Sequence, residues 1–281
     1  NEQVGPIIEK VYQEKPTIIA ASMWLFNHEA FMHLCARLKA LLPKVVIVLG
    51  GPEFLGNNET FLRNHPYVSC VFRGEGEEVF PQWLATFDNA EQWASIHGIC
   101  FVDARNEYHD NGKAIVMRFN QLTAPEESKF FNWEKPFVQL ETTRGCFNTC
   151  AFCVSGGEKP VRALSLEQIK QRLDLIHKHG IKDVRLLDRT FNYHTRRAKA
   201  LLDMFRQYAP HMRFHLEIHP ALLTDELKEA LATLPAGLLH LEAGIQSLRE
   251  EVLATCKRKG TLNNALQGLK YLCSLPNMVT H

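Results

Sequence analysis

Short apolar segments alternate with amphipathic segments along most of the 281-residue chain, and this alternation limits the fold more than any other feature. Apolar runs of strand length, separated by stretches with helical periodicity, are typical of α/β folds with parallel sheets. In the first half of the chain the pattern predicts a doubly wound, flavodoxin-like sheet. In the second half it predicts part of a TIM-type (β/α) barrel, whose active-site residues would lie at the carboxyl ends of the strands.

The pattern assigns these elements by residue range. In the first half it predicts a helix at 4–13, strands at 17–22, 45–49 and 69–73, helices at 29–42 and 77–87, and a hairpin formed by 98–103 and 114–119. In the second half it predicts strands at 137–142, 183–187, 213–218 and 238–243, and helices at 165–178, 195–208 and 224–233. Ser165 with Gln168 three residues later predicts a capping box at the first of these helices.

Composition and length predict two domains of a soluble protein. At roughly 150 residues a domain, we expect a first domain at 1–124, a linker at 125–136 and a second domain at 137–281. The start without methionine and the strand-like end at 278–281 predict a fragment of a longer, C-terminally truncated protein.

Charge gives no support for nucleic-acid or membrane partners. The net charge is +1 and the pI is about 7.8, so the composition gives no excess of basic residues of the kind that binds nucleic acids. No apolar stretch reaches the ~18 residues of a membrane span, and the polar start is unlike a signal peptide. We therefore expect a cytoplasmic protein whose cysteines are thiols or metal ligands rather than disulfides.

Three cysteines in the pattern C-x3-C-x2-C follow the predicted strand 137–142, namely Cys146, Cys150 and Cys153. Three thiolates hold three irons of a [4Fe–4S] cluster and leave the fourth iron open to another ligand. A structural zinc site normally takes a fourth Cys or His nearby, and none follows within the next twenty residues. A zinc site and three unrelated core cysteines remain as alternatives. The other five cysteines are predicted to be core residues: Cys35, Cys70, Cys100, Cys256 and Cys273.

Two glycine-rich segments follow predicted strands of the first half. Gly50, Gly51 and Pro52 come after 45–49, and Gly74, Glu75 and Gly76 come after 69–73. Ligands of open α/β sheets bind at the carboxyl ends of strands, where glycine lets the backbone approach closely. These segments therefore predict a ligand site, although tight turns alone would explain them.

Together with the cysteine motif, in which Phe152 precedes the third cysteine, these segments resemble the class B radical S-adenosylmethionine (radical SAM) proteins. This group includes methyltransferases and anaerobic Mg-protoporphyrin IX monomethyl ester cyclases, and a cobalamin-binding domain precedes its radical SAM domain. The resemblance implies a [4Fe–4S] cluster, S-adenosylmethionine (SAM) and cobalamin as cofactors. It further implies reductive cleavage of SAM to a 5′-deoxyadenosyl radical that takes hydrogen from a substrate, for methylation or oxidative cyclisation.

The resemblance also implies the residues of each site. The cobalamin contacts would be Ser22, Trp24, Asn27, Gly50, Gly51, Pro52, Gly74, Glu75 and Gly76. The SAM contacts would be Phe152, Asp188, Asn192, Glu217, Glu242, Gln246, Ser247 and Arg258, with Arg189 beside them. Two features depart from the family: the Asp-x-His-x-x-Gly motif that supplies an axial histidine is absent, and the first βα unit of the cobalamin domain is missing.

The charges of the side chains suit some of the SAM contacts that the resemblance implies, while other contacts have alternative interpretations. Carboxylates fit the SAM ammonium and ribose hydroxyls, and Arg258 fits its carboxylate, although Arg258 also suits a solvated helix end. We expect Glu217 and Glu242 to be functional because charged residues are rarely buried in apolar strands. His215, Glu217 and His219 alternate along a strand, which leaves a metal site as a minor alternative.

The resemblance implies the class of electron donor but not the identity of the substrate. The substrate, small or macromolecular, is unknown, and the electron donor would be a flavodoxin or ferredoxin. The loop 154–162, with Gly156 and Gly157, is either a lid over the cluster or a connection to the next helix. The alternative function is a non-catalytic iron–sulfur redox, sensor or partner-binding module.

Overall fold

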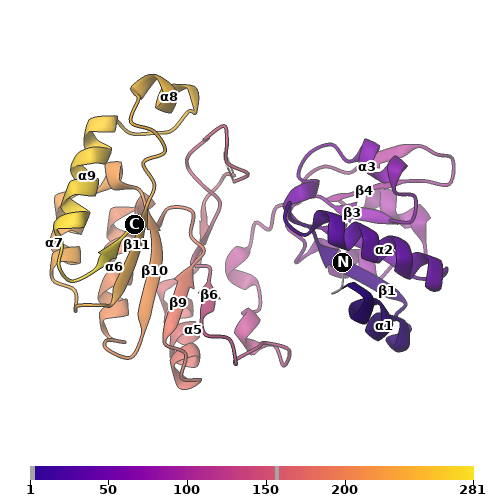
Figure 1. The fold of residues 1–281 in the computed structure, drawn as a ribbon, viewed down its shortest axis with the longest axis horizontal. Coiled ribbons are helices and arrows are strands. Elements are labelled where there is room, and N and C mark those ends of the chain that lie inside the picture. The colour runs from indigo at the N-terminus through magenta and orange to yellow at the C-terminus, as the bar shows by residue number, and fades with distance from the viewer. Residues whose placement is uncertain (1–3, 156–157) are drawn as a thin grey trace. The chain divides into compact units, whose positions relative to one another are not determined.

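The computed structural model describes residues 4–155 and 158–281, so Gly156 and Gly157 of the proposed lid lie outside the described residues. The chain forms two compact units that divide between Met117 and Arg118 (Figure 1). Each unit has its own hydrophobic core, and each is described by itself. None of the described helices is both long and apolar enough to cross a membrane.

The first unit is a five-stranded sheet in the order β1-β2-β3-β4-β5 (Figure 1). Strands β1 to β3 are parallel, whereas β4 and β5 are antiparallel to their neighbours. Its elements are α1 (Val4–Glu14), β1 (Ile18–Ser22), α2 (His28–Leu41), β2 (Val46–Gly50), η1 (Pro52–Phe54), α3 (Glu59–Asn64), β3 (Cys70–Phe72), α4 (Val79–Leu84), η2 (Ala90–Ser95), β4 (Ile99–Val102) and β5 (Tyr108–Asp110).

The predicted hairpin is wrong in its second strand. Residues 114–119 form no strand apart from one bridge between Gly74 and Ala114, and β4 pairs instead with β5. The chain reverses earlier because the Asp103 carboxylate accepts the backbone N–H groups of Arg105 and Glu107, which makes a tight turn there. The sheet is therefore mixed, with parallel strands β1 to β3 and an antiparallel hairpin of β4 and β5 at its edge.

The second unit is a parallel sheet in the order β12-β11-β10-β9-β6, as the barrel pattern predicts. The capping box at Ser165 and Gln168 is confirmed. Its elements are η3 (Phe119–Gln121), η4 (Pro125–Glu127), β6 (Val138–Leu140), β7 (Thr143–Arg144), β8 (Arg162–Ala163), α5 (Leu166–Lys178), β9 (Asp183–Leu186), η5 (Phe191–Tyr193), α6 (Thr195–Arg206), β10 (Arg213–Ile218), η6 (Pro220–Leu222), α7 (Asp225–Ala232), β11 (Leu239–Ala243), α8 (Glu250–Thr255), α9 (Leu262–Ser274) and β12 (Val279–Thr280).

The two faces of this sheet differ in polarity. In β10, Phe214, Leu216 and Ile218 are buried in a core shared with α5, α6, α7 and α9. The alternate residues His215 and Glu217 lie on the opposite face, because side chains alternate along a strand. The second unit therefore presents a polar inner face beside an apolar, helix-covered one.

The segment expected to be a linker, 125–136, packs within the second unit. Glu126 is 4% exposed, and its carboxylate pairs with Arg172 of α5 at 2.7 Å. Phe131 and Trp133 pack against the same core. A buried carboxylate requires such a partner, so this segment is anchored and the division between the units falls earlier, at Met117.

Candidate functional site

The cysteine loop lies between two short strands at the carboxyl end of β6. Thr143 of β7 pairs with Ala163 of β8 and Arg144 with Arg162, so the loop from 145 to 161 is closed at its base. Inside it, the Cys146 N–H donates to the Glu158 carbonyl at 2.8 Å. Cys146 and Cys150 are buried and Cys153 is exposed. One side of the trio therefore faces protein and the other faces solvent.

Gly145 enables the chain to enter this loop. Its φ of +96° lies in the region that favours glycine, and a Cβ there would lie 2.6 Å from the Glu158 carbonyl oxygen. Any larger residue would push the two sides of the loop apart immediately before Cys146.

Asp188, which follows β9, holds the residues beneath the loop. Its carboxylate accepts the N–H groups of Thr142 and Thr143 at 2.7 and 2.9 Å, together with the Thr142 hydroxyl. Asp188 is 2% exposed, and burial raises the pKa of its carboxyl although the three hydrogen bonds oppose the rise. Asp188 was expected to contact SAM; its oxygens are engaged with the loop, so its visible role is to position the cysteines.

Two further residues fix the loop, and sequence analysis missed both. The Thr190 side chain lowers the pKa of the Cys146 thiol, against the effect of burial, and its hydroxyl donates to the Arg189 carbonyl at 2.7 Å. Arg197 of α6 donates to the carbonyls of Thr142 and Leu164 at 3.1 and 3.0 Å, one on each side of the loop base. The sequence offered only their positions as a signal: Thr190 comes shortly after β9, and Arg197 lies in the first turn of α6.

The donor set suits a cluster better than a single ion. Burial raises the pKa of the Cys146 thiol, and repulsion from Cys153 and Cys150 adds to the rise, so a positive group in the loop would stabilise the Cys146 thiolate. Among the described residues, the ligand atoms of Asp103, Glu107 and His109 gather within 4.8 Å, but the three cysteine sulfurs do not. A polynuclear iron–sulfur group spans a wider set of sulfurs than one zinc ion does.

The carboxyl ends of β9, β10 and β11 place further predicted residues near this edge. Asn192 is buried, and its amide exchanges two hydrogen bonds with the His219 backbone at 2.8 and 2.9 Å. Glu217 and Glu242 are register partners on the inner face. Both are exposed, so the premise that they are buried charges is wrong. Burial against its neighbours nevertheless raises the pKa of Glu217, Arg189 lowers it and Glu242 raises it.

The segment after β11 meets the cysteine loop. The Arg258 guanidinium is half-buried and donates to the Gly244 carbonyl at 2.6 Å, so Arg258 is not a solvated helix end. The Ala151 N–H donates to the Cys256 carbonyl at 3.0 Å. Gln246 has a φ of +73°, and the Ser247 hydroxyl accepts the Arg249 N–H. Phe152 is 56% exposed at the same end.

Two minor expectations fail. His219 lies beyond β10 and is 3% exposed, apart from His215 and Glu217, so the three do not form a metal site. Burial and the nearby Arg258 lower the pKa of His219 to about 4. Of the five cysteines predicted to be core, Cys273 is exposed and Cys256 is half-buried, because each lies near the solvent side of its helix end.

In the first unit, three loops lie side by side because β1, β2 and β3 are adjacent and parallel. After β1, the Asn27 side chain accepts the Trp24 N–H and donates to the Ser22 carbonyl, which leaves Trp24 44% exposed. After β2, Gly50 is followed by Gly51, whose φ is +102°. Pro52 then begins η1.

After β3, the third loop begins at Gly74, whose φ is +106°. The Glu75 carboxylate accepts the Val116 N–H at 2.7 Å, and Gly76 has open space around it. All nine residues expected to contact cobalamin thus occur at one edge of the sheet.

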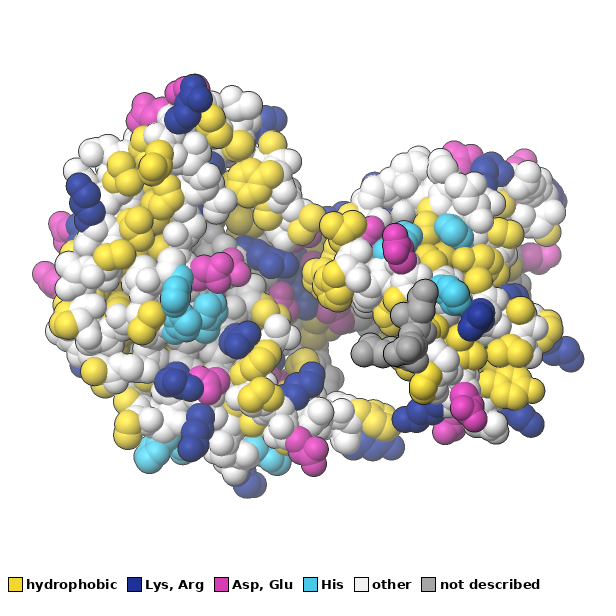
Figure 2. Space-filling model, viewed as in Figure 1, with side chains coloured by type: hydrophobic (Ala, Val, Ile, Leu, Met, Phe, Trp, Pro, Cys, Tyr) yellow, Lys and Arg dark blue, Asp and Glu magenta, His cyan; other side chains and the backbone are white. Residues whose placement is uncertain are grey.

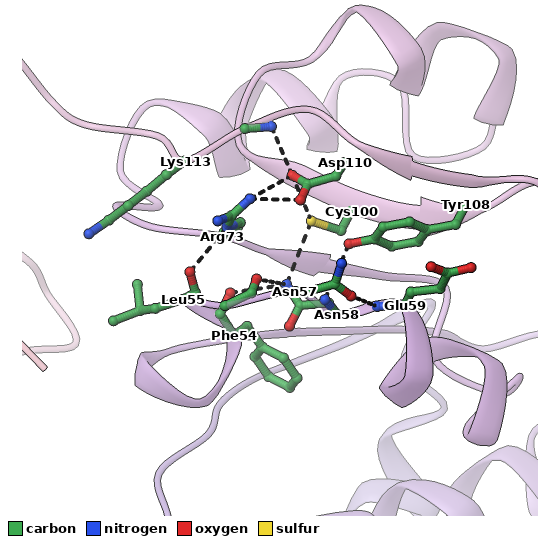
Figure 3. Close-up of polar contacts among 12 residues, drawn as sticks. Phe54, Leu55, Asn57, Asn58, Glu59, Arg73, Cys100, Tyr108, Asp110 and Lys113 are labelled. Carbon is green, nitrogen blue, oxygen red and sulfur yellow. Dashed lines mark hydrogen bonds and ion pairs between the residues drawn. The ribbon is translucent and has the colours of Figure 1, made fainter.

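A polar network behind β2 and β3 holds two of these loops to the β4–β5 hairpin (Figure 3). Arg73 donates to the Leu55 carbonyl and pairs with Asp110 at 2.7 Å. Asn58 donates to the carbonyls of Phe54 and Gly56, and its N–H donates to the Tyr108 hydroxyl. Sequence analysis missed this network because its members come from segments up to fifty residues apart.

The described geometry is that of an α/β protein with a cysteine loop at the carboxyl edge of a parallel sheet. The family model of the radical SAM superfamily matches residues 140–280, and that of the B12 binding domain matches residues 3–84. The chain therefore belongs to the radical SAM superfamily and carries a B12-binding type sheet before its radical SAM sheet.

Curated relatives match the chain at low identity. They include an uncharacterized methyltransferase of Pyrococcus horikoshii, 27% identical over 57% of this chain and 37% of its own length. The cobalamin-dependent radical SAM methyltransferase TokK of Streptomyces tokunonensis is 24% identical over 63% of this chain and 28% of its own. A tRNA-2-methylthio-N(6)-dimethylallyladenosine synthase of Psychrobacter cryohalolentis is 26% identical over 81% of this chain and 45% of its own length. The chain thus spans less than half the length of these relatives.

Solved structures share the fold. The cobalamin-dependent SAM radical enzyme OxsB covers 99% of this chain and 42% of its own, with a TM-score of 0.78 and 18% identity. The radical SAM methyltransferase TsrM of Kitasatospora setae covers 98% of this chain and 58% of its own, with a TM-score of 0.78 and 16% identity.

Proposed function

We propose that this protein is a cobalamin-dependent radical SAM enzyme, and that its reaction is a methylation. The observation that carries the proposal is the closed cysteine loop at the carboxyl edge of β6, next to the ends of β9, β10 and β11. A cluster bound there would stand at the edge where barrel enzymes hold their reacting groups. The relatives named as methyltransferases favour methylation over oxidative cyclisation.

Cys146, Cys150 and Cys153 would hold the [4Fe–4S] cluster. When bound, it supplies an electron that cleaves SAM and releases a 5′-deoxyadenosyl radical able to take hydrogen from an unactivated carbon. The protein's own task is positioning. Asp188 and Arg197 fix the base of the cysteine loop, and buried Cys146 and Cys150 keep two ligands away from water.

We propose that SAM is bound by residues at the carboxyl ends of the strands whose polar atoms can still accept or donate hydrogen bonds. Glu217 and Glu242 would accept hydrogen bonds from the ammonium and ribose groups, and Phe152, Gln246 and Ser247 would border them. Arg258 would reach the SAM carboxylate while it stays bonded to the Gly244 carbonyl. Asp188 and Asn192 would support this site through the residues that they bind, Thr142 and His219.

Cobalamin would bind over the three loops of the first unit. The close approach of Gly51 to Met23 and of Gly74 to Ala114 leaves backbone, rather than side chains, at these strand ends. The exposed Trp24 adds an apolar surface of the kind that a corrin ring would cover. We expect a flavodoxin or ferredoxin as electron donor.

The deciding experiment is SAM cleavage by the anaerobically reconstituted chain. We expect dithionite with SAM to yield 5′-deoxyadenosine, detected by mass spectrometry, and the Cys150→Ala variant to yield none. The matched control is Cys273→Ala, which removes an exposed cysteine outside the loop and should keep the yield. A visible cluster in the unmodified protein without 5′-deoxyadenosine would contradict the proposal and favour the redox or partner-binding module.

A further inference from the structure

A row of basic and imidazole side chains crosses the inner face of the second sheet. Arg185 of β9 is the register partner of His215 of β10, and His215 is the partner of His240 of β11. The rings of His215 and His240 lie 4.9 Å apart, and the ring of His281 lies 4.6 Å from that of His240. Figure 2 shows histidines gathered with acidic and basic side chains on this part of the surface.

The row borders a cavity of about 580 Å³ at the amino-terminal half of the strands. Phe137, Phe214 and Leu239 supply apolar walls, and Arg213 lies at the same end. Arg213 is already paired with Asp183 at 2.8 Å. The cysteine loop follows the carboxyl end of β6, so this cavity is distinct from the cluster site along the strand direction.

Arg185 is held in place without a carboxylate partner. Its guanidinium lies 3.8 Å from the centre of the Phe137 ring, which fixes its plane. Among the described residues, no carboxylate lies within ion-pair distance of it. A guanidinium stacked by one face keeps its N–H edge available for two parallel hydrogen bonds to an oxyanion.

His215 lies beside Arg185, and His240 lies one strand further, so both add imidazole nitrogens to the row. The His215 Nε2 lies 3.3 Å from a Glu242 carboxylate oxygen, which orients the ring. The His240 Nε2 is buried and has no hydrogen-bond partner in the described part of the chain. Buried polar atoms of this kind are rare without a ligand or water. Burial lowers the pKa of His240, as do His215, His281 and Arg185, while Glu242 raises it.

We propose that Arg185, His215 and His240 form an oxyanion-binding site that holds an acid group of the substrate, either a carboxylate or a phosphate. This inference rests on the proposed function, because it assigns the cavity to the substrate of that reaction. Ile218, at the end of β10, is the third residue after His215, which is a distance of roughly 10 Å at about 3.3 Å per residue. The substrate is therefore an elongated acid whose reacting carbon lies on the order of 10 Å from its anionic end.

A metal ion is a weaker occupant for this row. Among the described residues, its nitrogen and oxygen atoms do not gather within 4.8 Å of one another as those of Asp103, Glu107 and His109 do. An uncompensated guanidinium would also repel a cation. The Arg185 guanidinium and the His240 Nε2, which is unpartnered among the described residues, both favour an anion at this end of the row.

The test is a titration of the full chain, without cluster or SAM, with inorganic phosphate and separately with succinate. The imidazole nitrogens are followed by NMR after ¹⁵N-histidine labelling, and the signals are assigned with His215→Gln and His240→Gln. We expect an anion to move the His240 signals toward the imidazolium form. Arg185→Gln should raise the dissociation constant at least about tenfold, while Arg196→Gln, which removes an exposed arginine of α6, should leave it unchanged.

Each outcome decides the question. Binding of phosphate alone supports a phosphate-bearing substrate, and binding of succinate supports a carboxylate. No response to either anion, or equal binding by Arg185→Gln, overturns the site; His240→Gln serves the same purpose if Arg185→Gln does not fold. Anion binding together with absent 5′-deoxyadenosine would overturn the proposed function and leave the anion site in place.

Discussion

The glycine loops of the first unit and the cysteine loop of the second both follow carboxyl ends of parallel strands, but they are held in different ways. The loop after β2 is held by a network spread over Arg73, Asn58 and Tyr108. At the base of the cysteine loop, one buried carboxylate, Asp188, accepts three hydrogen bonds, and Arg197 donates to a carbonyl on each side. A network of several contacts, among them the Arg73–Asp110 ion pair, tolerates the loss of one hydrogen bond better than a site where one buried carboxylate accepts three.

The difference matches what each loop would hold. A cluster needs three sulfurs at fixed positions, so small shifts at the base of its loop matter. A broad ligand over the first sheet needs several loops held at fixed positions, and the β4–β5 hairpin, beside β3 in the sheet, contributes Tyr108 and Asp110 to that support. Single substitutions can therefore separate the two kinds of support.

The largest effect is expected for Asp188→Asn. The amide removes the charge that strengthens all three hydrogen bonds and places an NH2 group against the Thr142 hydroxyl, so we expect a loss of about 3 kcal/mol in the free energy of unfolding of the second unit. Iron incorporation should fall as well. Urea unfolding, followed by hydrogen exchange of peptides from β6 and β9, measures the loss. The control is Asp203→Asn, which removes an exposed helix ion pair with Lys199 and should cost under about 0.5 kcal/mol. Equal losses in both variants would show that Asp188 does not hold the loop.

A smaller effect is expected for Gly51→Ala in the first unit. The φ of +102° and a Cβ only 2.6 Å from the Met23 carbonyl oxygen should cost about 2 kcal/mol and move the loop. Gly56→Ala, a few residues later, meets no atom within 4 Å and should be nearly neutral. Hydrogen exchange near β2 and a cobalamin absorbance titration would compare the two variants. If Gly56→Ala weakens cobalamin binding as much as Gly51→Ala does, the strained glycine is not what shapes the site.

The smallest effect is expected for Tyr108→Phe. It removes the hydroxyl that accepts the Asn58 N–H at 3.2 Å, but Asn58 keeps its bonds to the Phe54 and Gly56 carbonyls. We expect a loss of about 1 kcal/mol, measured by urea unfolding beside Tyr12→Phe, a change at an exposed tyrosine of α1. A loss as large as that of Asp188→Asn would show that the support of the first unit is concentrated rather than spread.

Local patterns predicted most of the fold. Period and turn signals placed β6, β9, β10 and β11 of the second unit to within about two residues, and the capping box began α5 as predicted, whereas the short strands β7 and β8 were missed. The hairpin failed because the choice between 108–110 and 114–119 as partner of β4 depended on a side-chain turn at Asp103. The anchored segment 125–136 was missed because the ion pair of Glu126 with Arg172 joins residues far apart in sequence.

The sequence by itself determined the cysteine spacing, the order of strands and helices, and the glycines where the backbone turns sharply, because each depends on a few consecutive residues. Only the tertiary structure decided that Asp188 supports the cysteine loop, that Glu217 and Glu242 are exposed, and that Arg185, His215 and His240 form one row. These facts depend on which strands are neighbours and in which register they pair. Neither is encoded in the residues around any one position.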